Sequence, residues 1–302
     1  MRDQADKLRQ IIDNIKLRQA VNQAALINSI KKKTAKVITV TSGKGGVGKT
    51  NVTINLAITL SEMGNRVIIL DADFGLANID VLFGIIPKYT LVDVINNNKN
   101  ILEVLADGPQ NIRFLSGGSG VEELIKLEKP QLERFVDNIG LLDKIADVIL
   151  IDTGAGLSDN VMNFVMAADE VVLVTTPEPT SITDAYALIK MVSNRDKEKI
   201  IKVIVNRADT INEANDILSK LTMVSEKFLN LKLDSIGYIL HDEAVIKAVK
   251  QQSPFTLSFP KSQASKSIRE ISKKLVENSD DKKVENTGIK SFISKLVNFL
   301  NS

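Results

Sequence analysis

Eight consecutive residues early in the chain have the types and the spacing of a loop that binds phosphate groups. They read Gly43-Lys44-Gly45-Gly46-Val47-Gly48-Lys49-Thr50, and Asn51 follows directly. Glycines let backbone N–H groups approach phosphates closely, and a helix that starts at the end of such a loop adds positive potential. The Lys49 ammonium can then reach the β- and γ-phosphates, and the Thr50 hydroxyl can ligate Mg²⁺. The sequence therefore predicts a site for a nucleotide and Mg²⁺.

Four more polar residues come at or just after the ends of apolar runs. Asp71 and Asp73 follow the run 66–70, Asp152 follows another apolar run, and Asn206 a third. Ligands of parallel sheets bind beyond the carboxyl ends of the strands. Carboxylates suit both a hard cation and a water proton, so these residues are candidates for the same site. Helix capping is the competing reading for each aspartate alone, and it weakens when three stand beside a phosphate loop.

The elements that must position these residues alternate along the chain. Short apolar runs at 37–41, 66–70, 147–151, 171–175, 200–205 and 235–240 predict strands. Helical patterns at 50–63, 181–192 and 213–229 separate some of them. Near-continuous apolar strands joined through helices indicate a sheet that is covered on both faces. The predicted fold class is α/β, with a mostly parallel central sheet and helices on both faces.

Composition excludes several kinds of site. The 302 residues are 44% hydrophobic and 25% charged, which is typical of a soluble globular protein. The chain has no cysteine and one histidine. This composition excludes disulfides, thiolate-ligated zinc or iron–sulfur clusters and cysteine nucleophiles, and it argues against a histidine-based metal site. No apolar stretch approaches ~18 residues and no secretory segment is evident, so the expected location is the cytoplasm.

Four zones can be distinguished along the chain. Residues 1–36 carry nine Lys or Arg against three Asp or Glu, a net +6 in a chain whose total is +2. We expect a basic helical extension there, which could meet an acidic partner, an anionic membrane or nucleic acid. The domain that holds the phosphate loop spans 37–276. A polar linker at 277–288 then leads to a terminal helix at 289–302.

The terminal helix is amphipathic. One face consists of apolar residues, namely Ile289, Phe292, Ile293, Leu296, Val297, Phe299 and Leu300. The other face is polar and has two lysines and no acid, which is the pattern of a helix that lies in a membrane interface. The helix is too short to span a bilayer. A helix docked on the protein body has the same pattern, but the polar linker before it favours a movable element over a docked one.

The loop resembles the deviant Walker A motif of the MinD/ParA ATPases because Lys44 stands inside it. The resemblance implies that Lys44 reaches the nucleotide of a partner subunit in an ATP-dependent homodimer. It also implies that Asp73 positions the attacking water, that Asp71 and Asp152 belong to the Mg²⁺ shell with Thr50, and that Asn206-Arg207 reads the base of ATP or ADP. Lys44, Lys49 and Asp73 would be the catalytic residues. Leu240 stands where a proline is usual in the family's last loop.

The N-terminal extension narrows the resemblance. It carries a short element whose matching residues are Asp3, Gln4, Ala5, Leu8 and Arg9. This element is similar to that of the FlhG (YlxH) family, MinD-type ATPases that control flagellar number and position. The resemblance implies that Gln4 helps to stimulate the GTPase FlhF, and that the terminal helix binds an anionic membrane surface in the ATP state. It makes flagellar switch-complex proteins further candidate partners. It also implies that the protein lies peripherally on the inner face of the cell membrane in the ATP state.

Other functions stay open at this point. A ParA-type partition or division-site positioning ATPase is the alternative, and the basic N-terminus keeps DNA binding open. The apolar face of the terminal helix argues against nucleic acid, because DNA binding has no use for it. An iron–sulfur carrier of the same superfamily is excluded by the missing cysteines. A non-hydrolysing adaptor would use nucleotide only as a conformational switch.

Overall fold

The computed structural model describes residues 34–73, 78–96, 99–117, 123–124, 127–277 and 287–300. The chain divides into two compact units, 1–34 and 35–302. The FlhG-like element at residues 3–9 and most of the predicted linker lie outside the described residues. Everything below concerns the second unit.

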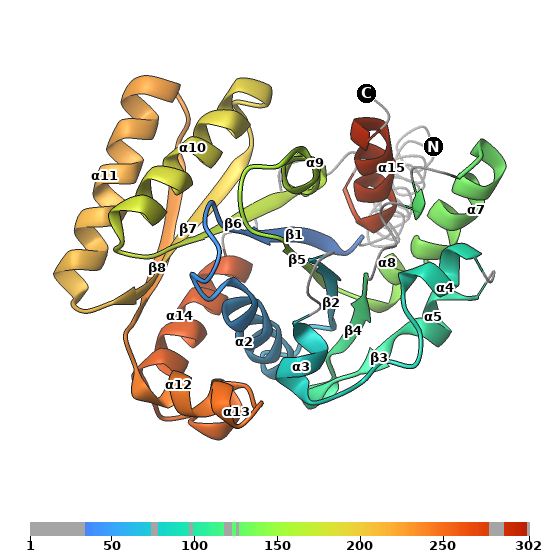
Figure 1. Ribbon diagram of the computed structural model, residues 1–302, viewed down its shortest axis with the longest axis horizontal. Helices are drawn as coiled ribbons and strands as arrows, with labels where there is room; N and C mark the ends of the chain where they lie inside the picture. Colours follow the sequence, from blue (N-terminus) through green and yellow to red (C-terminus); the bar gives the residue numbers. More distant parts are fainter. Residues whose placement is uncertain are drawn as a thin grey trace, which may run out of the picture. The chain divides into compact units, whose positions relative to one another are not determined.

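An eight-stranded sheet forms the centre of this unit (Figure 1). Its spatial order is β3-β4-β2-β5-β1-β6-β7-β8, and every neighbouring pair is parallel except β3 with β4. The strands are β1 (Lys36–Thr41), β2 (Val67–Ala72), β3 (Ala106–Asp107), β4 (Arg113–Ser116), β5 (Val148–Thr153), β6 (Glu170–Thr175), β7 (Ile200–Ala208) and β8 (Leu233–Leu240).

Helices cover both faces of the sheet. On one face lie α2 (Lys49–Glu62), α3 (Ile79–Phe83), α12 (Glu243–Lys250), α13 (Phe255–Ser258) and α14 (Gln263–Glu277). On the other lie α4 (Leu91–Asn96), α5 (Ile101–Val104), α7 (Lys129–Ile139), α8 (Leu142–Ile145), α9 (Asp159–Ala167), α10 (Pro179–Arg195), α11 (Ile211–Leu229) and α15 (Ile289–Leu300). A short 3₁₀ turn, η1 (Pro109–Asn111), precedes β4.

The strand sequences explain this three-layer arrangement. Successive strand residues point to opposite faces. In β1, Ile38 and Val40 pack toward α2 and α14, whereas Val37 packs toward the layer of α9 and α15. In β5, Leu150 and Ile151 divide in the same way between the two layers. Both sets are buried, so the strands read as continuous apolar runs rather than as an alternation.

The predicted α/β class and the mostly parallel sheet are confirmed. Three differences have physical reasons. The strands β2 and β5 continue through their aspartates, because Asp71 and Asp152 are ladder partners on adjacent strands. The edge strands β3 and β4 were not predicted, since they have two and four residues and little periodicity to detect. The predicted start of the domain at residue 37 lies two residues after the boundary between the units.

The terminal helix α15 is docked on the body of the protein in this structure. The expectation that the polar linker makes it movable stays a prediction. In Figure 1 it lies between α9 and α7, and it also packs against α8 and β1. Five of its apolar side chains are at most 5% exposed: Ile289, Phe292, Ile293, Leu296 and Val297. The Phe292 ring stands 6.0 Å from that of Phe164 on α9. Leu300 is partly buried in the same cluster, and Phe299 is 37% exposed. The apolar stripe therefore faces a groove of the body.

The buried and exposed phenylalanines of α15 give a test of this packing. We expect Phe292→Ala to lower the protection of the α15 amides against hydrogen exchange by about 100-fold, because removing a buried phenylalanine costs ~3 kcal/mol. Phe299→Ala is the matched control and should change protection by less than about fivefold, since its side chain is partly in water. Equal effects of the two variants would contradict the docked arrangement.

Candidate nucleotide site

The predicted phosphate loop connects β1 to α2 at the carboxyl edge of the sheet. Gly46 and Gly48 adopt left-handed backbone conformations, with φ of 78° and 89°, which favour glycine. A Cβ on Gly48 would stand 2.5 Å from Nδ2 of Asn206, so a larger residue does not fit there. The loop residues 43–48 and the helix start at Lys49 thus form the backbone cradle that the sequence predicts, with the N-terminus of α2 directed at it.

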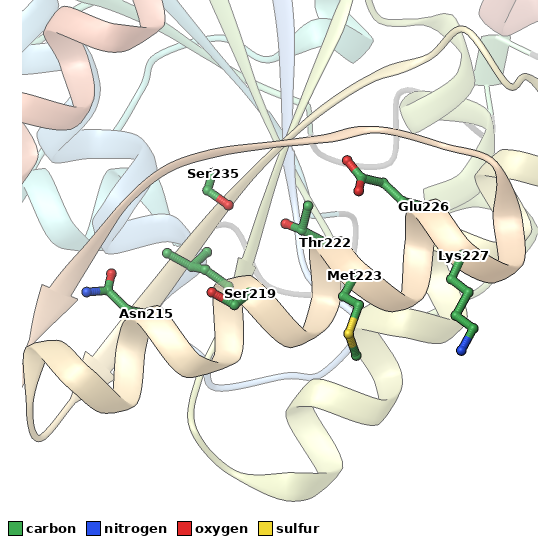
Figure 2. A pocket seen from close by; sticks show the side chains of 8 residues that line it. Asn215, Ser219, Thr222, Met223, Glu226, Lys227 and Ser235 are labelled. Atoms are coloured by element: carbon green, nitrogen blue, oxygen red, sulfur yellow. The ribbon is translucent and has the colours of Figure 1, made fainter.

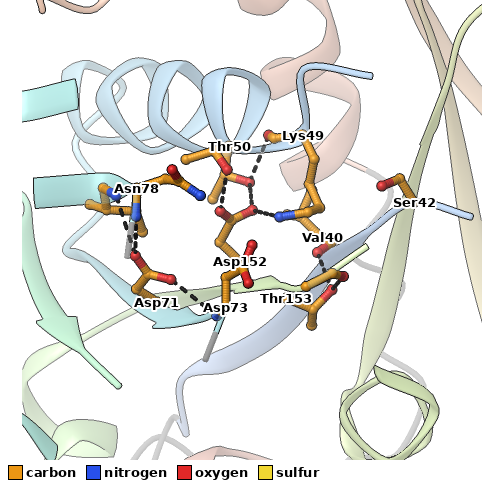
Figure 3. Close-up of polar contacts among 12 residues, drawn as sticks. Val40, Ser42, Lys49, Thr50, Asp71, Asp73, Asn78, Asp152 and Thr153 are labelled. Carbon is orange, nitrogen blue, oxygen red and sulfur yellow. Dashed lines mark hydrogen bonds and ion pairs between the residues drawn. The ribbon is translucent and has the colours of Figure 1, made fainter. Parts of the chain in front are cut away.

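Asp152 is the centre of the polar contacts in this site (Figure 3). Its carboxylate is fully buried and accepts three side-chain hydrogen bonds. Lys49 Nζ donates to Oδ1 at 2.9 Å, and Thr50 Oγ1 donates to Oδ2 at 2.7 Å. Thr53 Oγ1, one helical turn beyond Lys49, also donates to Oδ1 at 2.9 Å. The lysine predicted to bind phosphate, the hydroxyl predicted to bind metal and the aspartate near the end of β5 therefore meet at one point.

Asp71 lies beside Asp152 on the neighbouring strand. Its carboxylate accepts backbone N–H groups from Asp73 at 3.1 Å, Asn78 at 3.1 Å and Ile79 at 3.3 Å. Burial, and secondly the charge of Asp152, raise the pKa of Asp71 to about 6. Asp71 thus binds the backbone at Asp73 and again at Asn78 and Ile79.

Asp73 lies close to the loop after β5. A Cβ added to Gly154 would stand 3.6 Å from Oδ1 of Asp73. The loop after β5 is in turn bound to β1 and the phosphate loop, because Gly156 N donates to Ser42 O at 2.9 Å and Thr153 Oγ1 donates to Val40 O at 3.2 Å. The segments that begin at Asp73 and Thr153 therefore meet next to the phosphate loop.

Lys44 points away from the cradle. Its Nζ donates to Glu178 Oε2 at 2.6 Å and to Thr180 Oγ1 at 2.8 Å, both at the start of α10. The Lys44 and Glu178 side chains are 38% and 59% exposed. The hydrogen bond from Lys44, and secondly its charge, lower the pKa of Glu178. Lys44 thus belongs to the surface of the site rather than to the Asp152 cluster.

The predicted base-reading pair lies next to the loop. Asn206 is buried at the end of β7, and its Nδ2 donates to Val47 O at 2.8 Å. Arg207 is exposed and has a left-handed backbone, with φ of 58°. The Asn206 amide therefore fixes the phosphate loop, a contact that the sequence does not reveal.

The donor set fits Mg²⁺. The Thr50 hydroxyl and the Asp152 carboxylate are in hydrogen-bond contact, and Asp71 is adjacent, so all the candidate ligands are oxygens, as this cation prefers. Groups of three or more His, Cys, Asp or Glu that could hold a metal are absent from the part of the chain that the structure describes.

Two contacts of the site were not predicted. Thr53 is the third donor to Asp152. The sequence could have indicated this contact, because Thr53 lies four residues after Lys49 and so shares a helix face with it. Glu178 lies directly before α10, and its ion pair with Lys44 joins residues 134 apart in the chain. A single sequence carries no signal for such a contact.

A separate hollow of about 760 Å³ lies between α11 and β8 (Figure 2). Hydroxyl, amide and methionine side chains line it together with Glu226 and Lys227. None of the predicted site residues is among its lining residues. The candidate site is therefore the phosphate loop with its strand-end aspartates.

Comparisons with known proteins agree with this geometry. The family described as "ParA: NUBPL iron-transfer P-loop NTPase" matches residues 33–276. The chain belongs to the ParA/MinD family of P-loop ATPases. It is 44% identical over 239 residues to the antiactivator FleN of Pseudomonas aeruginosa. The aligned residues make up 79% of this chain and 85% of FleN. It is 34% identical over 269 residues to the flagellum site-determining protein YlxH of Helicobacter pylori, which covers 88% and 90% of the two chains.

A solved structure shows the same fold. The MinC:MinD cell division complex of Aquifex aeolicus contains a chain that matches with a TM-score of 0.65 at 27% identity, covering 84% of this chain and all of that one. The family description mentions iron transfer. This chain has no cysteine, so it cannot hold an iron–sulfur cluster through thiolates. Among the described helices, none is long and apolar enough to cross a membrane.

The raised pKa of Asp71 gives a pH test of the site. An aspartate whose pKa rises from 3.8 to about 6 on folding binds more protons in the folded state, so stability falls as pH rises through that window. We expect Asp71→Asn to flatten this fall and to raise the free energy of unfolding at pH 7 by on the order of 2 kcal/mol. Urea unfolding at pH 4 to 7, with EDTA and without nucleotide, measures it. An unchanged pH slope would contradict the assignment.

Proposed function

We propose that this ATPase is an ATP-dependent dimerising switch that acts at the membrane to regulate flagellar number or placement. The observation that carries the proposal is the combination of an outward-pointing Lys44 with an amphipathic helix docked beside α9. The similarity to FleN and YlxH over most of each chain supports the flagellar role. The docked helix supports a state off the membrane from which α15 can be released.

The residues of the site define how hydrolysis would proceed. The Lys49 ammonium would leave Asp152 for the β- and γ-phosphates, and the backbone N–H groups of the loop would hold the oxygens on which charge develops. Asp73 would orient a water for in-line attack on the γ-phosphorus, with ADP as the leaving group. Thr50, Asp152 and Asp71 would hold Mg²⁺, which supplies neutralising charge when bound. Lys44 from a partner subunit would complete the site.

Dimerisation requires Lys44 to exchange partners. In the structure its ammonium is held within the same chain by Glu178 and Thr180. Exposed ion pairs contribute only about 0–1 kcal/mol, so the cost of leaving this contact is small. The charge of a nucleotide in a facing subunit would outweigh it, because four-negative ATP in a partly buried interface is a stronger partner than one exposed carboxylate.

The helix α15 connects to the nucleotide site through one continuous segment. Asp152 is the last residue but one of β5, the loop with Gly154 and Gly156 follows, and α9 starts at Asp159. α15 lies directly on α9. A shift of the loop on binding of ATP would move α9 and disturb the groove that buries α15. In a dimer two released helices would bind one anionic surface together, which multiplies their weak individual affinities.

Vesicles containing phosphatidylglycerol provide the test of this switch. We expect wild type to cosediment with them in ATP and not in ADP, with an affinity difference of about 100-fold because two helices act together. Asp73→Ala, which removes the water-positioning carboxylate, should remain bound. Lys44→Ala should lose the ATP dependence while it still binds nucleotide. Binding that is equal in ATP and ADP, or absent in both, would contradict the proposal.

The predicted activator element at residues 3–9 is tested separately. We expect a peptide of residues 1–36 to stimulate GTP hydrolysis by FlhF, and Gln4→Ala to remove the stimulation, because a glutamine can orient the attacking water without titrating. GTP turnover by FlhF with each peptide is the measurement. A peptide in which Asn22 is replaced by Ala is the matched control and should stimulate normally. Equal stimulation by all three peptides would contradict the role of Gln4.

The alternative function is a partition or division-site positioning ATPase. The MinD chain of the MinC:MinD complex, which shares the fold, supports it. Under this alternative the ATPase would still dimerise, and the peptide of residues 1–36 would leave FlhF unchanged. ATP-dependent retention on DNA rather than on vesicles would favour the partition form.

A further inference from the structure

Two aspartates hold the first residues of β1 and the first residues of α15 at the same time. Asp143, on α8, accepts the Ala35 N–H at 3.2 Å and the Ile289 N–H at 2.9 Å on its Oδ1. Its Oδ2 accepts the Lys290 N–H at 3.4 Å. One carboxylate thus bonds the point where the chain enters the sheet and the first turn of the terminal helix.

Asp169 repeats this arrangement from another element. It stands between α9 and β6, and its Oδ2 accepts the Val37 N–H at 2.9 Å. It also accepts a hydrogen bond from the Gly288 backbone N–H. Burial raises its pKa, which these two N–H groups and Lys295 oppose. Two separate carboxylates therefore each bridge β1 and α15.

These bonds satisfy a requirement of the helix. The first N–H groups of a helix have no acceptor within it, and carboxylates near them are favoured by the helix dipole. The N–H groups of Gly288, which directly precedes α15, and of Ile289 and Lys290 in its first turn find acceptors on the body of the protein. The docked position of α15 therefore depends on two charges outside the helix, Asp143 on α8 and Asp169 between α9 and β6.

We propose that Asp143 and Asp169 form a clamp that couples the docking of α15 to the anchoring of residues 35–37, where the N-terminal extension joins the sheet. When α15 leaves, both carboxylates become hydrated and water competes for their bonds to Ala35 and Val37. By linkage, loosening of residues 35–37 weakens the docking of α15 by the same factor. Given the proposed function, a lipid surface that takes up the C-terminal helix would thereby change how firmly residues 35–37 are anchored.

Hydrogen exchange of individual backbone amides tests the clamp in the full-length chain. We expect Asp143→Asn and Asp169→Asn each to speed exchange of the α15 amides about fivefold, the factor that matches the loss of one helix cap. The Val37 amide should speed up by a similar factor in Asp143→Asn, although Asp143 does not bond it. Asp137→Asn is the control. Asp137 pairs with the exposed Lys290 side chain and bonds none of the backbone amides in question, so neither set of amides should change by more than about twofold.

Deletion of residues 287–302 is the second variant, and it leaves both aspartates in place. Exchange at Ala35 and Val37 should rise at least fivefold in it. Unchanged exchange at these amides in the deletion variant, or faster exchange of α15 alone in the aspartate variants, would overturn the proposal. The measurement is made without lipid or nucleotide. A clamp that behaves as expected in a protein that never binds vesicles would refute the membrane switch and leave the clamp standing.

Discussion

The buried carboxylate of Asp152 is the constraint on which the site depends. It is fully inaccessible to water, and a buried unpaired carboxylate is costly, so its partners are not optional. Lys49, Thr50 and Thr53 satisfy it, and all three lie on the first turns of α2. The glycine loop brings the start of α2 against β5. Under the proposed function, a nucleotide with Mg²⁺ would compete with Asp152 for Lys49 and Thr50, so Asp152 would be the first residue to respond to binding.

That response has short routes to two surfaces. One passes from β5 through the loop at Gly154 and Gly156 into α9, which forms part of the groove under α15. The other passes from the loop hydrogen bond between Gly156 and Ser42 to Lys44, whose own carbonyl accepts from the Ser42 hydroxyl. The two surfaces are held by contacts of different strength: an exposed ion pair in one case and the buried apolar face of α15 in the other. Under the proposed function, release of α15 needs another apolar environment for that face, which a membrane interface supplies.

Much of this architecture could be predicted from the sequence, because local patterns determine it. The glycine spacing, the apolar runs and the aspartates that end them place the phosphate loop, the sheet and the Asp71–Asp152 pair. The docking of α15 could not be predicted, since an apolar stripe is the same whether it meets lipid or a groove. That groove is assembled from Phe135, Leu142 and Phe164, which are far from the helix in sequence. The Lys44–Glu178 pair and the Asp143–Asp169 clamp are long-range contacts of the same kind.

The central claim is that the nucleotide decides whether α15 is docked, and the distance between α15 and the body tests it directly. Because the chain has no cysteine, Ser294→Cys on α15 and Glu133→Cys on α7 create two unique sites for spin labels, both on exposed positions. Pulsed electron–electron double resonance should give one narrow distribution of the distance between the two spin labels in ADP. In ATP with phosphatidylglycerol vesicles, it should give a longer and broader distribution. The same narrow distance in both states would contradict the account.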